Sequence, residues 1–156
     1  MRVAVGSDHA GFELKVSLAA HLAGLGHEVV DYGTWGTESV DYPDFGAAVG
    51  RGVVGGQADL GVCTCGTGIG ISIAANKIPG VRAAVVHDVS SATLAREHNN
   101  ANVVCFGGRL TTPHVATEAL DAFLGAAFQG GRHQRRIEKI AALEVSSGAG
   151  EAGGVG

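Results

Sequence analysis

The sequence predicts an α/β fold in three layers (αβα), built around a doubly wound, five-stranded parallel sheet of Rossmann-like type. Short apolar runs alternate with longer segments of helical periodicity, which is the pattern of repeated βαβ units. The chain has 156 residues, enough to bury a core without a metal or a disulfide. Its 26 glycines follow no three-residue period and therefore indicate tight turns instead of a collagen-like chain.

Five apolar segments predict the strands, which cover residues 3–6, 28–32, 59–65, 81–87 and 103–106. The helical patterns cover 12–24, a segment from about 43, 71–77, 88–99, a segment from 111 or 112, and 133–143. Glycines at 46, 50, 52, 55 and 56 weaken the second helix by up to about 1 kcal/mol each. We expect one domain over residues 1–145 and a disordered, glycine-rich tail over 146–156.

Charge and cysteine content exclude several classes of protein. The formal net charge is −4 and the pI is about 5.9, so the chain lacks the basic field of a nucleic-acid-binding protein. No apolar run reaches the roughly 18 to 20 residues that span a bilayer, and the first residues lack the features of a signal peptide. We therefore expect a cytoplasmic location and no nucleic-acid or membrane partner. Cys63, Cys65 and Cys105 lack zinc-ligand spacing, so no metal site is expected.

Titratable residues follow three of the predicted strands. In a doubly wound sheet, ligands bind outside the carboxyl ends of the strands. Asp8 and His9 follow the first strand, Cys65 ends the third, and His87 and Asp88 follow the fourth. These residues are candidates for a site at that edge, although Asp8 and Asp88 are also suited to cap helices.

The segment CGTGIG, residues 65–70, leads from a strand into a helix, where free backbone N–H groups and the helix dipole favour an anion. A dinucleotide fingerprint is incomplete because Ile71 occupies its third glycine position, and Lys77 lies too far into the helix for a P-loop. The other candidate anion is an enediolate, with Cys65 as the base. Lowering a thiol pKa from about 8.5 to about 7 requires roughly 2 kcal/mol, the upper end of what one helix terminus provides. The alternative for Cys65 is the role expected of Cys63 and Cys105, that of a small buried apolar residue.

Basic residues are scarce, but four fall within eight positions, at 132, 135, 136 and 139. Arg132 and Arg136 share one helical face, where two guanidinium groups can bind a phosphate. A solvated charged face is the alternative. Arg109, just after the last strand, is a further candidate for the same phosphate.

Several motifs in order along the chain resemble the type B ribose-5-phosphate isomerases and their galactose-6-phosphate and allose-6-phosphate isomerase relatives. They are VAVGSDHAGF (3–12), DYPD (41–44), CGTGIGIS (65–72), ANK (75–77), EHNN (97–100), GGR (107–109) and RHQRR (132–136). The resemblance covers about residues 1–143. It implies an aldose–ketose isomerase of a small sugar phosphate that needs no metal or organic cofactor and works as a homodimer or homotetramer.

The resemblance also implies roles for individual residues. Cys65 would be the base, and His98 would open the furanose ring. The residues that would stabilise the enediolate are Gly66, Thr67, Gly68 and Gly70. Those that would contact sugar hydroxyls are Asp8, Tyr42 and Asn99. Those that would bind the phosphate are His9, Arg109, Arg132 and Arg136. Some family members use a glutamate a few residues after the turn; Ile71 and Ser72 stand there, so this chain follows the thiol branch.

Chain geometry separates two of these residues. The helix that ends near His98 must return to the amino-terminal edge of the sheet before the last strand begins. Because a five-residue strand is about 17 Å long, His98 is too far from Cys65 of its own chain to act on one sugar. We therefore expect a neighbouring subunit to supply His98, with two composite sites in a symmetric dimer.

The expected reaction is the interconversion of ribose 5-phosphate and ribulose 5-phosphate. Alternatives are the isomerisation of a six-carbon sugar phosphate, such as allose or galactose 6-phosphate, or of a free sugar. A third alternative is a phosphate-binding module without catalysis. A thiol redox protein is disfavoured because Cys63 and Cys65 are two apart on a strand and point the same way.

Overall fold

Five parallel strands form the central sheet of the computed structural model, which describes the backbone of residues 1–148 and the side chains of residues 1–144. The strands are β1 (Arg2–Ser7), β2 (Glu28–Asp31), β3 (Leu60–Cys65), β4 (Ala83–Val85) and β5 (Val103–Gly107). They are ordered β2-β1-β3-β5-β4, and every neighbouring pair is parallel. The predicted five-stranded parallel sheet is therefore confirmed.

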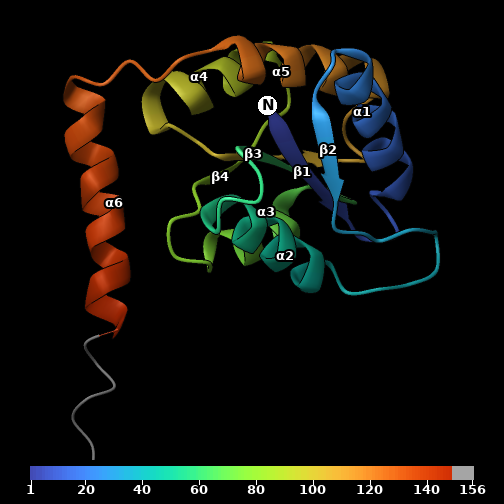
Figure 1. The fold of residues 1–156 in the computed structure, drawn as a ribbon, viewed down its shortest axis with the longest axis horizontal. Coiled ribbons are helices and arrows are strands. Elements are labelled where there is room, and N and C mark those ends of the chain that lie inside the picture. The colour runs from blue at the N-terminus through green and yellow to red at the C-terminus, as the bar shows by residue number, and fades with distance from the viewer. Residues whose placement is uncertain (149–156) are drawn as a thin grey trace, which may run out of the picture.

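The helices are α1 (Phe12–Gly24), α2 (Tyr42–Val54), α3 (Ile69–Asn76), α4 (Val89–Asn99), α5 (Pro113–Gly125) and α6 (Arg132–Gly148). Figure 1 shows α1, α4 and α5 on one face of the sheet and α2 and α3 on the other, while α6 stands apart from both layers. The doubly wound, three-layer architecture is confirmed. No helix in the part of the chain that the structure describes is long and apolar enough to cross a membrane.

Two apolar clusters hold the three layers together. One packs α1, α4 and α5 against the sheet and includes Leu18, Val62 and Phe123. The other packs α2 and α3 against the opposite face and includes Val49 and Cys63. Neighbouring positions on β3 thus contribute to opposite cores, as the alternation of side chains along a strand requires.

Some boundaries differ from those that the sequence predicts. The helix α2 forms despite its glycines, because they allow close packing: a Cβ on Gly46 would lie 2.7 Å from the carbonyl oxygen of Ile71 in α3. The helix α3 begins two residues early, at Ile69, directly after Gly68 with φ of 76°. The edge strand β4 is shorter than expected. Residues 146–148, the start of the predicted tail, lie in α6, and residues 149–156 are outside the described part.

Candidate active site

The carboxyl ends of β1, β3 and β5 meet so closely that the backbone requires glycine. A Cβ on Gly11 would lie 2.4 Å from the backbone of Thr64, and one on Gly107 would lie 2.6 Å from the backbone of Thr67. The Thr64 hydroxyl also donates a hydrogen bond of 2.7 Å to the carbonyl oxygen of Gly11. The loop after β1, the turn after β3 and the end of β5 therefore form one tightly packed unit.

The turn that links β3 to α3 carries a backbone donor directed at a thiol. The N–H group of Gly68 donates to Sγ of Cys65 at 3.1 Å. The positive φ of Gly68, 76°, gives the turn the shape that brings this N–H back over the sulfur. A donor at the sulfur, at the amino end of a helix, stabilises negative charge there. The turn thus places a backbone donor directly at the Cys65 sulfur.

All three thiols are buried, and they differ mainly in their hydrogen-bond partners. Cys65 is only 3% exposed, and it belongs to the apolar cluster under α2 and α3. Cys63 and Cys105 are fully buried in the same cluster, and the hydrogen bond with Cys63 together with burial raises the pKa of Cys105 well above its usual value. Cys105 therefore stays protonated and acts as packing, as the sequence predicted for both of these cysteines.

Asp8 and His9 lie beside this turn. An Asp8 carboxylate oxygen accepts a hydrogen bond of 2.9 Å from the N–H of Gly11, so Asp8 holds the start of α1 as well as facing the site. Nδ1 of His9 accepts a hydrogen bond of 3.2 Å from the N–H of Val40. Because a backbone N–H can only donate, Nδ1 is unprotonated and the ring proton sits on Nε2. His9 is thus oriented by the loop that joins β2 to α2.

Two further predicted residues pack directly on glycines of the turn. The ring of Tyr42, the first residue of α2, packs against Gly70. A Cβ added to Gly70 would lie 2.6 Å from Cζ of that ring. The guanidinium of Arg109 covers Gly66 in the same way, since a Cβ added to Gly66 would lie 2.9 Å from Nη1. These glycines make room for a phenol and a cation against the turn that follows Cys65. The residues that the structure brings together at this edge are Asp8, His9, Tyr42, Cys65, Gly66, Thr67, Gly68, Gly70 and Arg109.

The other predicted residues lie at the opposite edge of the sheet. The carbonyl oxygen of Asn102, three residues after Asn99, accepts from the N–H of Gly61 at the start of β3. Cys65 is four residues further along β3, about 13 Å away at 3.3 Å per residue. His98 stacks on His133, with ring centroids 4.2 Å apart. The second group comprises His98, Asn99, Arg132, His133 and Arg136.

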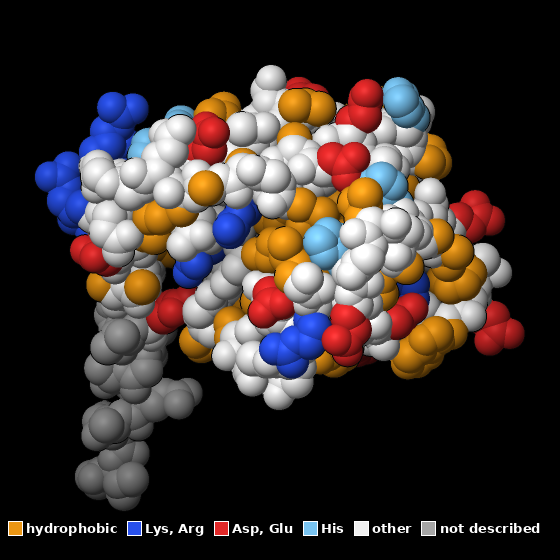
Figure 2. All heavy atoms as spheres, turned by 45° about the horizontal axis from the view of Figure 1, so that its top comes forward, with side chains coloured by type: hydrophobic (Ala, Val, Ile, Leu, Met, Phe, Trp, Pro, Cys, Tyr) orange, Lys and Arg blue, Asp and Glu red, His pale blue; other side chains and the backbone are white. Residues whose placement is uncertain are grey.

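Positive charge gathers in this second group. Figure 2 shows Lys and Arg side chains clustered where α6 begins, the position of Arg132, Arg135 and Arg136. Burial, followed by the positive charges of His98, Arg132 and Arg136, lowers the pKa of His133. The arrangement is suited to binding an anion.

His87 and Asp88, the candidates after the fourth strand, have a structural setting. A carboxylate oxygen of Asp88 accepts from the N–H of Ser91 at 2.7 Å and caps α4. Hydrogen bonds from Ser91, chiefly from its backbone, lower the pKa of Asp88. Among the described residues, no three His, Cys, Asp or Glu side chains gather in a way that would hold a metal ion.

Two residues near these groups have no role that the sequence predicts. His133 lies in the RHQRR motif at the start of a predicted helix, without a role of its own. Lys15 is 1% exposed and pairs with Asp31 at 2.8 Å. The spacing in the sequence indicates its burial, because Lys15 lies three residues before Leu18 and seven before Leu22, on the buried face of α1.

Comparison with known proteins identifies the family of the chain. The profile of the family described as "Ribose/Galactose Isomerase" matches residues 3–140. Ribose-5-phosphate isomerase B of Escherichia coli is 50% identical over 143 residues, which cover 92% of this chain and 96% of that protein. The galactose-6-phosphate isomerase subunit LacB of Clostridium acetobutylicum is 42% identical over 139 residues, covering 89% of this chain and 80% of the subunit.

Solved structures show the same fold. Ribose-5-phosphate isomerase B of Clostridium thermocellum has a TM-score of 0.94 at 49% identity, covering 94% of this chain and 99% of that one. The Mycoplasma genitalium enzyme, solved with bound ribulose-5-phosphate, has a TM-score of 0.88 at 44% identity, covering 92% of this chain and 96% of that one. With a matching profile over most of its length and relatives at this identity, the chain belongs to the ribose/galactose isomerase family.

Proposed function

We propose that the chain interconverts ribose 5-phosphate and ribulose 5-phosphate, with Cys65 as the base. The observation that supports this most directly is the hydrogen bond from the Gly68 N–H to the Cys65 thiol, in a chain 50% identical to a ribose-5-phosphate isomerase B. The donor favours the thiolate, which is the form that can take up a proton. The first turn of α3 presents further N–H groups that have no partner within the helix.

The reaction moves two protons: one base carries the proton between the two carbons, and the hydroxyl proton on the oxygen of carbon two passes to the oxygen of carbon one while the enediolate exists. After the ring opens, the Cys65 thiolate takes the proton from carbon two of the aldose, and the electron pair forms an enediolate. The N–H groups at the start of α3 stabilise the negative charge on the enediolate oxygen. The thiol then returns the proton to carbon one, which gives the ketose and regenerates the thiolate. General acid–base transfer of this kind contributes about 10² to 10⁴-fold to the rate.

The active unit is a homodimer with composite sites. One chain holds the Cys65 group and the His98 group at opposite edges of its sheet, although both are assigned to the same sugar phosphate. The helix α6 stands off from the rest of the chain (Figure 1) and borders an open groove of about 780 Å³ lined in part by Pro79, Val81, Ala83 and Ile140. A second copy can occupy this apolar space and bring its His98, Arg132 and Arg136 to the Cys65 group.

An isomerase assay over a panel of sugars tests the proposal. We expect turnover of ribose 5-phosphate, with solvent deuterium appearing at carbon one of the product because the thiol exchanges its proton. Preferential turnover of galactose or allose 6-phosphate would favour the second candidate, which the 42% identical galactose-6-phosphate isomerase subunit supports. Binding of the sugar phosphates without deuterium incorporation would contradict catalysis. The cytoplasmic location expected from the sequence stays a prediction.

A further inference from the structure

Lys15 is among the largest fully buried side chains that the structure describes, and the reaction proposed above makes no use of it. It lies on the second turn of α1 and is 1% exposed. Its ammonium group contacts both carboxylate oxygens of Asp31, at 2.8 and 3.0 Å, and the carbonyl oxygen of Thr34. All three of its donors are therefore used on residues at the end of β2 and just beyond it.

A stabilising role does not account for this arrangement. Removing a lysine from water costs several kcal/mol, and a well-packed apolar side chain often replaces a buried ion pair without loss of stability. Buried pairs of this kind can instead fix one conformation among several. The part of the chain whose conformation Lys15 can fix is the loop from Tyr32 to Asp41, which joins β2 to α2.

The start of this loop is attached to both β1 and α1. Asp31 accepts a second hydrogen bond from the N–H of Gly33 at 2.8 Å. Ser7, the last residue of β1, exchanges backbone hydrogen bonds with Gly33 and Thr34 at 2.7 and 2.8 Å. The ammonium of Lys15 links this part of the loop to α1, and it also lies 6.0 Å from the ring centre of Trp35.

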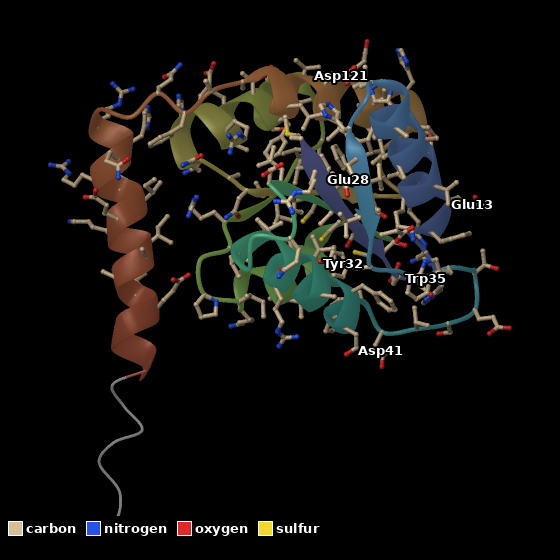
Figure 3. The ribbon with its side chains drawn as sticks, in the orientation of Figure 1. Glu13, Glu28, Tyr32, Trp35, Asp41 and Asp121 are labelled. Atoms are coloured by element: carbon tan, nitrogen blue, oxygen red, sulfur yellow. The ribbon has the colours of Figure 1, made fainter. Side chains whose placement is uncertain are left out.

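The far end of the same loop holds two residues of the site. Val40 donates its N–H to Nδ1 of His9, and the loop ends at Tyr42, whose ring packs on Gly70. Figure 3 shows Trp35 on this loop near the beginning of α1 and Asp41 where the loop meets α2. A shift of the loop would therefore turn the His9 ring and displace Tyr42.

We infer that Lys15 is a positioning residue, which sets the substrate-binding half of the site by fixing the 32–41 loop and, through Val40, the orientation of His9. This inference rests on the proposed function, because it takes His9 and Tyr42 to contact the sugar phosphate, as the family resemblance implies.

The geometry predicts which kinetic constant depends on Lys15. The Cys65 turn is held by β5, through hydrogen bonds from Gly108 to Cys65 and from Arg109 to Gly66, at 2.8 and 2.9 Å. These contacts do not involve the 32–41 loop. Loosening the loop therefore weakens substrate binding and leaves the proton transfer largely unchanged. We expect Lys15→Met to raise KM about tenfold and to keep kcat within about threefold.

Trp35 provides a readout that does not depend on activity. It is the single tryptophan of the chain and is 72% exposed, so fluorescence anisotropy reports the motion of this loop alone. Lys15→Met should lower the anisotropy. The double variant Lys15→Met/Asp31→Asn should lower the anisotropy as well. Because it also removes the carboxylate that Lys15→Met leaves unpaired, it serves as the test if the single variant folds poorly.

Leu22→Ala is the matched control, because it leaves a cavity on the same buried face of α1 but about two turns from Lys15, at the other end of that helix. It should lower the unfolding temperature while leaving KM and the Trp35 anisotropy as in the wild type. Unchanged KM and anisotropy in both Lys15 variants, or a loss confined to kcat, would overturn the inference. A wild-type chain inactive on every sugar phosphate would instead overturn the proposed function, and the anisotropy would still decide whether Lys15 holds the loop.

Discussion

At the scale of the residue, two cysteines on one strand differ by a single backbone donor. Cys65 accepts a hydrogen bond from the N–H of Gly68, whereas the fully buried Cys63 is hydrogen-bonded to the Cys105 thiol. We expect Cys65→Ala to lower kcat by at least about 10²-fold, because the general base is lost. Cys63→Ala, the matched control on the same strand, should keep kcat close to that of the wild type. Steady-state assays and thermal unfolding of both variants check this, and wild-type turnover in Cys65→Ala would remove the thiol from the mechanism.

The candidate residues found from the sequence are those whose place follows from strand periodicity. Cys65, Asp8 and His9 end predicted strands, so their common edge could be inferred before any coordinates were known. Lys15 could not be assigned in the same way. Its spacing places it on a buried face, but its partner Asp31 is 16 residues away and its effect on His9 passes through a loop without regular structure.

At the scale of the element, α6 is joined to α4 by the stacked rings of His133 and His98. Burial and the neighbouring positive charges lower the pKa of His133, so the folded chain binds its proton less readily than the unfolded chain does. The contribution of His133 to the free energy of unfolding is therefore fully present above the pKa of the unfolded chain, about 6.5, and is lost as the pH falls below that value. We expect the unfolding temperature to drop between pH 7.5 and 5.5.

The control for this titration is His133→Gln, which cannot be protonated in that range. Its unfolding temperature should depend less on pH than that of the wild type when both are measured by calorimetry without a sugar phosphate. An equal decline in the two proteins would show that His133 does not couple to folding.

Elements were predictable where local pattern decides them and not where distant contacts do. The strands β3 and β5 match the predicted segments closely because both are continuous apolar runs between turn residues. The order of the sheet could not be read from the chain, since β5 lies between β3 and β4 through pairing that is not local. The stability of α2 likewise depends on the approach of Gly46 to α3, which helix propensity does not describe.

At the scale of the whole molecule, the proposed sites draw Cys65 from one chain and His98 from another, and mixed dimers test this directly. Cys65→Ala and His98→Asn should each be nearly inactive alone. In a dimer of one with the other, one site combines both substitutions, while the second combines an intact Cys65 with an intact His98. Random exchange of equal amounts makes half of the dimers mixed, so about a quarter of the wild-type activity should return.

The recovery depends on where the two residues come from and not on how strongly each contributes. If His98 acted on the Cys65 of its own chain, every site in the mixed dimer would still carry one substitution, and mixing would restore nothing. Refolding the variants together and separately, followed by assay at equal total protein, distinguishes the two arrangements. A preparation that light scattering shows to be monomeric and fully active would contradict the composite site outright, because the His98 and Cys65 groups of one chain lie at opposite edges of the same sheet.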